Sequence, residues 1–172
     1  MSVAEPRRIV LFRHAKADWP QVSDHERPLA DRGRMDAAEA GRRLADTGVP
    51  FDQALCSTAV RTRETWKLAV HELPDRPKTV YEERIYDASP GELIAVLNET
   101  PDDLSNVLVI GHNPGMEALT EILAGSAEAE VRERINRRGF PTAAFAVLTF
   151  TGSWKDVEPG TATLVDYWAP TD

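Results

Sequence analysis

Two short runs made only of apolar residues constrain the fold of this chain more than any other feature. Residues 9–12 read Ile-Val-Leu-Phe, and residues 107–110 read Val-Leu-Val-Ile. Apolar runs of this length, without polar alternation, are typical of strands that are buried on both faces of a parallel sheet. The two runs therefore predict central strands of a sheet that is covered by helices on both sides.

Segments with helical periodicity separate the predicted strands. We expect helices over residues 33–46 and 58–70, a helix that opens at Ser89 with a capping box, and a helix with Asn113 as its cap and Pro114 as its first residue. The apolar positions of each segment recur three and four residues apart, which places them on one helix face. The four predicted inner faces comprise Ala37, Ala40, Gly41, Leu44 and Ala45; Ala59, Thr62, Trp66 and Ala69; Leu93, Ile94 and Leu97; and Met116, Leu119, Thr120 and Leu123.

Further strands are predicted over residues 53–57, 79–81, 143–150 and 161–168, the last two as an antiparallel hairpin. Residues 13–31 lack periodicity and form a long loop, whereas the charged residues 125–139 give no clear pattern. Strands that alternate with helices predict an α/β fold: a three-layer sandwich whose largely parallel central sheet is flanked by helices.

The length and charge of the chain limit its organisation and its partners. With 172 residues, we expect one domain over residues 1–172, and the formal net charge of −8 argues against nucleic acid or an anionic membrane as partner. No stretch approaches the roughly 18 apolar residues of a membrane span, and residues 1–12 lack a signal-peptide pattern. We expect a cytoplasmic protein, in which the single Cys56 is a buried small hydrophobe.

Cationic side chains and histidines follow three of the predicted strands. Arg13-His14-Ala15-Lys16 follows the first apolar run, Ser57 and Arg61 follow residues 53–56, and Gly111-His112 follows the second apolar run. Ligands of such sheets bind at the carboxyl ends of the strands, so these groups are expected to meet there. Arginine matches phosphate oxygens with two parallel hydrogen bonds, and phosphoryl transfer depends mostly on positioning and charge stabilisation. The cluster therefore predicts phosphoryl chemistry.

These segments resemble the histidine phosphatase superfamily, which has the phosphoglycerate mutase-like fold. The resemblance rests on four segments, with Ala15 where the commonest family pattern has glycine, and a fifth segment in the tail is similar to the SixA branch. The segments are Arg13-His14-Ala15, Arg27-Pro28-Leu29-Ala30-Asp31-Arg32-Gly33, Ser57-Thr58-Ala59-Val60-Arg61-Thr62-Arg63-Glu64-Thr65, Gly111-His112-Asn113-Pro114 and, in the tail, Phe140-Pro141-Thr142-Ala143.

The resemblance implies a role for each matching residue. His14 would be the nucleophile, with one ring nitrogen held by a backbone carbonyl, and Arg13, Arg61 and a cationic His112 would bind the phosphoryl oxygens. Lys16 and Arg27 would assist binding, although Lys16 equally suits a solvated surface and Arg27 an ion pair with a loop carboxylate, Asp24 or Glu26. Glu83 lies where many members carry the acid that protonates the leaving oxygen, but an exposed charge remains an alternative for it.

The resulting expectation is a phosphatase that works through a phospho-His14 intermediate without metal or cofactor. Its substrate would be a protein phosphohistidine, as the SixA resemblance implies, or a small phosphate monoester hydrolysed at the same site. A non-catalytic phosphate-binding module is a third alternative. A metal-dependent hydrolase using His14, Asp18, His25 and His112 is disfavoured because the chain has no HxH, HxD or HExxH motif. The sequence leaves open the oligomeric state and the role of residues 125–139.

Overall fold

One seven-stranded sheet runs through residues 5–171, the part of the chain that the computed structural model describes. The strands lie in the order β3-β2-β4-β1-β6-β7-β5. Neighbours β1 and β4, β2 and β4, β2 and β3, and β5 and β7 are parallel, whereas β6 runs antiparallel to both β1 and β7. The strands are β1 (Arg7–Arg13), β2 (Gln53–Cys56), β3 (Lys78–Tyr81), β4 (Asn106–Gly111), β5 (Ala124–Ala127), β6 (Phe145–Phe150) and β7 (Ala162–Trp168).

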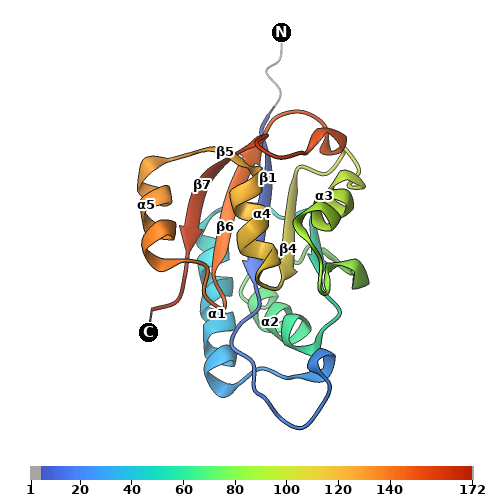
Figure 1. The fold of residues 1–172 in the computed structure, drawn as a ribbon, viewed down its shortest axis with the longest axis vertical. Helices are drawn as coiled ribbons and strands as arrows, with labels where there is room; N and C mark the ends of the chain where they lie inside the picture. The colour runs from blue at the N-terminus through green and yellow to red at the C-terminus, as the bar shows by residue number, and fades with distance from the viewer. Residues whose placement is uncertain (1–4, 172) are drawn as a thin grey trace.

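Helices cover both faces of the sheet, which confirms the predicted three-layer α/β sandwich (Figure 1). In β1, Ile9 and Leu11 belong to the core that includes α3 and α4, whereas Val10 and Phe12 belong to the core of α1 and α2. All four side chains are fully buried, as the unbroken apolar run predicted. The helices are α1 (Asp31–Asp46), α2 (Val60–Val70), α3 (Pro90–Asn98), α4 (Gly115–Leu123) and α5 (Ala129–Arg138), with short 3-10 helices η1 (Asp24–Glu26), η2 (Glu83–Ile85) and η3 (Trp154–Asp156).

The structure corrects the sequence-based elements in two places. Residues 125–139 contain a short edge strand, β5, followed by α5, which buries only Val131 and Ile135. With two buried apolar residues, this helix has too weak a pattern to be recognised in the sequence. In addition, Pro114 precedes α4 instead of opening it; the Asn113–Pro114 peptide bond is cis, and the Asn113 side chain accepts a hydrogen bond from the backbone N–H of Glu117.

The predicted long loop after β1 folds into a compact structure at the carboxyl edge of the sheet. Residues 14–30 extend beyond the tip of β1 at the bottom of Figure 1. An isolated bridge joins Ala17 to Leu29, and the amide of Ala30 donates to the carbonyl of Lys16. The loop therefore closes on itself and carries η1 at its far end. In residues 5–171, no helix combines the length and apolar character needed to cross a membrane.

Candidate active site

Parallel pairing of β1 and β4 brings the two predicted histidines together. Arg13, the last residue of β1, pairs with Gly111, the last residue of β4, and the amide of His14 donates to the carbonyl of Gly111. His14 and His112 thus leave adjacent strands at the same level. Their ring centroids lie 5.2 Å apart, close enough for both rings to contact one phosphoryl group.

The environment of His14 fixes the tautomer of its ring. Its Nδ1 lies 2.7 Å from the carbonyl oxygen of Ala15, and because a carbonyl only accepts, Nδ1 carries the proton. Burial of the ring, which is 8% exposed, lowers the pKa of His14 to about 3, and the neighbouring charges of Arg61 and Arg13 act in the same direction. Near neutral pH the imidazole is therefore uncharged, with an unshared electron pair on Nε2.

His112, which we expect to be cationic beside a phosphoryl group, lies in an environment that favours the neutral ring in the free site. Its Nε2 lies 2.8 Å from Oγ of Ser57, the residue that follows β2. Burial, and after it the positive charge of Arg61, lower the pKa of His112 to about 4, so the ring is neutral near pH 7. The sequence predicts that Arg61 lies near His112, but it cannot show that the His112 ring is buried.

Two buried nitrogen atoms at the strand ends lack hydrogen-bond partners within residues 5–171: Nε of Arg13, which is a donor, and Nδ1 of His112. Buried polar atoms are rarely left unpaired because their desolvation is unfavourable. Nη1 of Arg13 donates to the carbonyl of Phe140, which also accepts from the Asn113 side chain. The tail segment that begins at Phe140 therefore orients Arg13, and Nε of Arg13 and Nδ1 of His112 stay unpaired at the strand ends.

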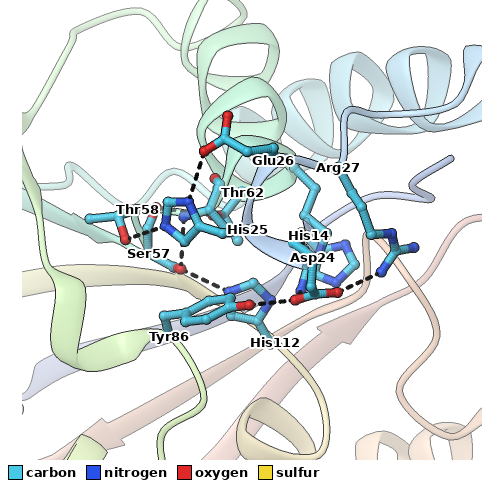
Figure 2. Close-up of polar contacts among 12 residues, drawn as sticks. His14, Asp24, His25, Glu26, Arg27, Ser57, Thr58, Thr62, Tyr86 and His112 are labelled. Atoms are coloured by element: carbon cyan, nitrogen blue, oxygen red, sulfur yellow. Dashed lines mark hydrogen bonds and ion pairs between the residues drawn. The ribbon is translucent and has the colours of Figure 1, made fainter. Parts of the chain in front are cut away.

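The arginines at the other side of the site share the carboxylate of Asp24, whose contacts with Arg27 and Tyr86 can be followed in Figure 2. Arg61, in the first turn of α2, is 7% exposed and contacts the Oδ2 atom of Asp24 at 3.0 Å. Arg27 contacts Oδ1 of the same aspartate at 3.2 Å, so the loop ion pair considered from the sequence is present. The hydroxyl of Tyr86 donates to Oδ2 of Asp24 at 2.5 Å, and its ring packs edge-on against His112.

Asp24 and Tyr86 were not predicted as site residues. The sequence predicts Asp24 only as a possible ion-pair partner of Arg27, and it gives no role to Tyr86, which lies three residues beyond Glu83. The apolar patterns locate strand ends, whereas the fold of the long loop and of η2 depends on contacts between distant segments. The one feature of the sequence that points to Asp24 is the presence of two acidic residues, Asp24 and Glu26, close to Arg27.

Two other predicted residues lie apart from this cluster. Glu83 is exposed at the start of η2, and within the described chain it makes no hydrogen bond or ion pair to His14, Arg61 or His112. Lys16 is also exposed, and it lines a hollow together with Arg32 and Asp36 of α1. The arginines of residues 125–139 serve the fold: Arg134 and Arg138 donate to carbonyls of the C-terminal segment.

The geometry can hold a tetrahedral oxyanion and present a neutral imidazole to it. Arg61 and Arg13 lie close enough to His14 for their charges to lower its pKa, and the ring of His112 lies beside it. Over residues 5–171, no three histidine, cysteine or acidic side chains are grouped so that they could hold a metal ion.

Comparisons with known proteins identify the family of the chain. Residues 9–93 match the family model of the histidine phosphatase superfamily, branch 1. An uncharacterised protein of Mycobacterium tuberculosis is 43% identical over 162 residues, which covers 92% of this chain and 99% of the relative.

Two solved structures extend the agreement to the whole fold. The proposed phosphohistidine phosphatase SixA of Nakamurella multipartitia has a TM-score of 0.80 and 32% identity, covering 98% of this chain and 99% of its own. A protein of the same description from Agrobacterium tumefaciens also has a TM-score of 0.80, with 30% identity, covering 97% of this chain and 100% of its own. The chain therefore belongs to the histidine phosphatase superfamily, in its SixA-like branch, and is a phosphatase.

Proposed function

We propose that this phosphatase hydrolyses the phosphoryl group of protein phosphohistidine through a covalent intermediate on His14. The observation that carries the proposal is the tautomer of His14. Nδ1 donates to the carbonyl of Ala15, and Nε2 is left free beside Arg13, Arg61 and His112. The names of the Nakamurella and Agrobacterium relatives support phosphohistidine as the substrate.

In the first step, Nε2 of His14 attacks phosphorus and the bond from phosphorus to the substrate nitrogen breaks. The substrate imidazole leaves with the bonding electron pair, and a proton on its ring makes it a neutral leaving group. In the second step, water attacks phosphorus, the bond to Nε2 breaks, and inorganic phosphate leaves with the water oxygen. One difficult displacement is thereby divided into two easier ones.

Positive charge around the phosphoryl group would stabilise both transition states. Arg13 and Arg61 contribute full charges, and His112, whose Nδ1 is unpaired, lies beside His14. A bound dianion would raise the pKa of His112, because a nearby negative charge favours the protonated ring. The cationic form expected from the sequence thus belongs to the complex, whereas the free site holds the neutral ring.

Glu83 remains our proposed proton donor for alkoxide leaving groups, and its role is limited to those substrates. A protonated imidazole already leaves readily, so phosphohistidine cleavage would not require a side-chain acid.

The test compares wild type with His14→Ala on p-nitrophenyl phosphate and on a phosphohistidine peptide. We expect turnover to fall on the order of 10³-fold or more, as for the loss of other covalent nucleophiles. A phosphoprotein label that is stable in base and labile in acid should also disappear. His71→Ala, at an exposed histidine that follows α2, is the matched control and should behave as wild type.

Retention of turnover or of the label in His14→Ala would contradict the mechanism. Higher kcat/KM for small phosphate monoesters than for the peptide would favour a metabolite phosphatase on the same site. Binding of phosphate without any turnover by wild type would indicate a non-catalytic module.

A further inference from the structure

The carboxylate of Asp24 occupies the position where two guanidinium groups of the site converge. It accepts hydrogen bonds from Arg61, Arg27 and the hydroxyl of Tyr86, at 3.0, 3.2 and 2.5 Å. In Figure 2 this carboxylate lies between Tyr86 and Arg27. The Tyr86 hydroxyl, followed by the two arginines, holds the pKa of Asp24 well below its usual range, so the group is an anion. The arginine donors that would bind phosphate are thus already engaged by a negative charge.

Each arginine also has a second hydrogen bond that does not involve this carboxylate. Nη1 of Arg61 donates to the backbone carbonyl of Asp24 at 2.7 Å, and Nε of Arg27 donates to the carbonyl of Asp18 at 3.0 Å. The Trp19 ring stacks on the Arg27 guanidinium at 3.2 Å. These contacts would keep both arginines oriented if the Asp24 side chain turned away.

The Asp24 side chain has room to leave. It is 50% exposed, whereas the side chains of Arg61 and Arg27 are 9% and 10% exposed. Rotation about the side-chain bonds of Asp24 would therefore move the carboxylate toward solvent, while the arginines stay fixed in the protein. Asp24 is therefore the one of these three residues that a ligand could displace.

We propose that Asp24 is a specificity-determining residue, an internal anion that holds Arg27 and Arg61 until an incoming phosphoryl group displaces it. The proposal rests on the phosphate site of the proposed function. A ligand gains the arginines only by replacing a carboxylate that has three hydrogen-bond donors. A phosphoryl dianion offsets that loss by also pairing with Nε of Arg13 and, once the ring is protonated, with Nδ1 of His112, whereas a carboxylate monoanion offers less charge and fewer oxygens.

The test is titration of inorganic phosphate into wild type, Asp24→Asn and Asp31→Asn by calorimetry at pH 8. Asn keeps the size of the side chain and removes its charge. We expect the Kd of Asp24→Asn for phosphate to be about tenfold lower, the equilibrium effect of one competing charge-assisted hydrogen bond. Asp31→Asn removes the same charge at a fully exposed position on α1 and should leave the Kd unchanged.

A second variant tests the same competition without changing the net charge. Tyr86→Phe removes one of the three donors that hold the carboxylate, so displacement becomes easier and phosphate should bind more tightly, by less than in Asp24→Asn. Acetate, titrated in parallel, should bind Asp24→Asn measurably and wild type much more weakly.

Unchanged or weaker phosphate binding by Asp24→Asn would overturn the proposal and assign Asp24 the role of positioning the arginines. Absence of phosphate binding by both proteins would overturn it as well. Failure of the proposed function is a separate result, because it would appear as unaltered turnover in His14→Ala, whatever the phosphate titrations give.

Discussion

At the scale of the residue, it can be tested directly whether Glu83 supplies the proton that a leaving group requires. If Glu83 protonates the leaving oxygen, Glu83→Gln should slow the hydrolysis of an alkyl phosphate more than that of a phosphohistidine peptide, because an alkoxide needs a proton and a protonated imidazole does not. The measurement is the ratio of kcat/KM for the two substrates.

Glu130→Gln, on an exposed residue in the first turn of α5, is the control for loss of one carboxylate. An equal decrease for both substrates would remove Glu83 as the acid. Its exposure and lack of contacts with the described site residues make this the sharpest test of a role that the sequence resemblance implied.

The sequence predicted the meeting of the cationic residues and the two histidines better than it predicted their partners. Arg13, His14 and His112 follow apolar runs whose strand character is unambiguous, so their meeting at one edge followed from topology. Asp24 and Tyr86 come from η1 and from the turn after η2, which have no periodic pattern. Their positions depend on the contacts that Arg27, Arg61 and His112 make with them in the folded chain.

At the scale of the element, the first turn of α1 determines where the long loop lies. Gly33 packs so closely that a Cβ atom on it would lie 2.0 Å from the carbonyl oxygen of Lys16. The amide of Ala30 donates to the same carbonyl, so the loop is fixed against the start of the helix. A side chain at position 33 would push the loop that carries Asp24 and Arg27 away from the site.

We therefore expect Gly33→Ala to lower the free energy of unfolding by roughly 1–3 kcal/mol, as overpacking does, and to reduce turnover. Gly91, in the first turn of α3, has open space where its Cβ would be, so Gly91→Ala should be neutral or stabilise by up to about 1 kcal/mol. Urea unfolding measures the free energy of unfolding of both variants relative to wild type. Equal stability would mean that the contact between Lys16 and Gly33 relaxes without cost.

The elements that bury an apolar face could be predicted from the sequence, whereas the element that buries little could not. The capping box at Ser89 is present, and the predicted inner faces of α2 and α4 are buried. The segment that the sequence left open, α5, buries little and is fixed by arginines that bind backbone carbonyls of the C-terminal segment. Hydrogen bonds of that kind leave no periodic signal in a sequence.

At the scale of the whole molecule, the burial of two imidazoles in a cationic site makes the stability of the fold depend on pH. The chain has a formal net charge of −8, yet its active site concentrates guanidinium groups around two buried imidazoles. Protonating either ring would place another positive charge in a desolvated cationic site. Burial and the nearby positive charges therefore favour the neutral form of His14 in the folded state.

This coupling predicts a loss of stability on mild acidification. The pKa values of His14 and His112 are lowered from an ordinary value of 6.5 to about 3 and about 4, mainly by burial. Between these values and 6.5, the unfolded chain binds protons that the folded chain does not, so the free energy of unfolding falls as the pH falls. The contribution is complete above about pH 6.5 and is lost as the pH approaches 4 and then 3. The depressed pKa of Asp24 adds to this loss only below about pH 4, where its carboxyl, with an ordinary pKa of 3.8, would protonate in the unfolded chain.

Urea unfolding between pH 7.5 and 4 measures this slope. The double variant His14→Asn/His112→Asn should show a flatter dependence of stability on pH, because it has no imidazole left to protonate at the site. His71→Asn, at the exposed histidine after α2, should retain the wild-type slope. A double variant that loses stability as steeply as wild type would mean that the two rings are less desolvated than the structure places them, and would weaken the case for a neutral nucleophile at His14.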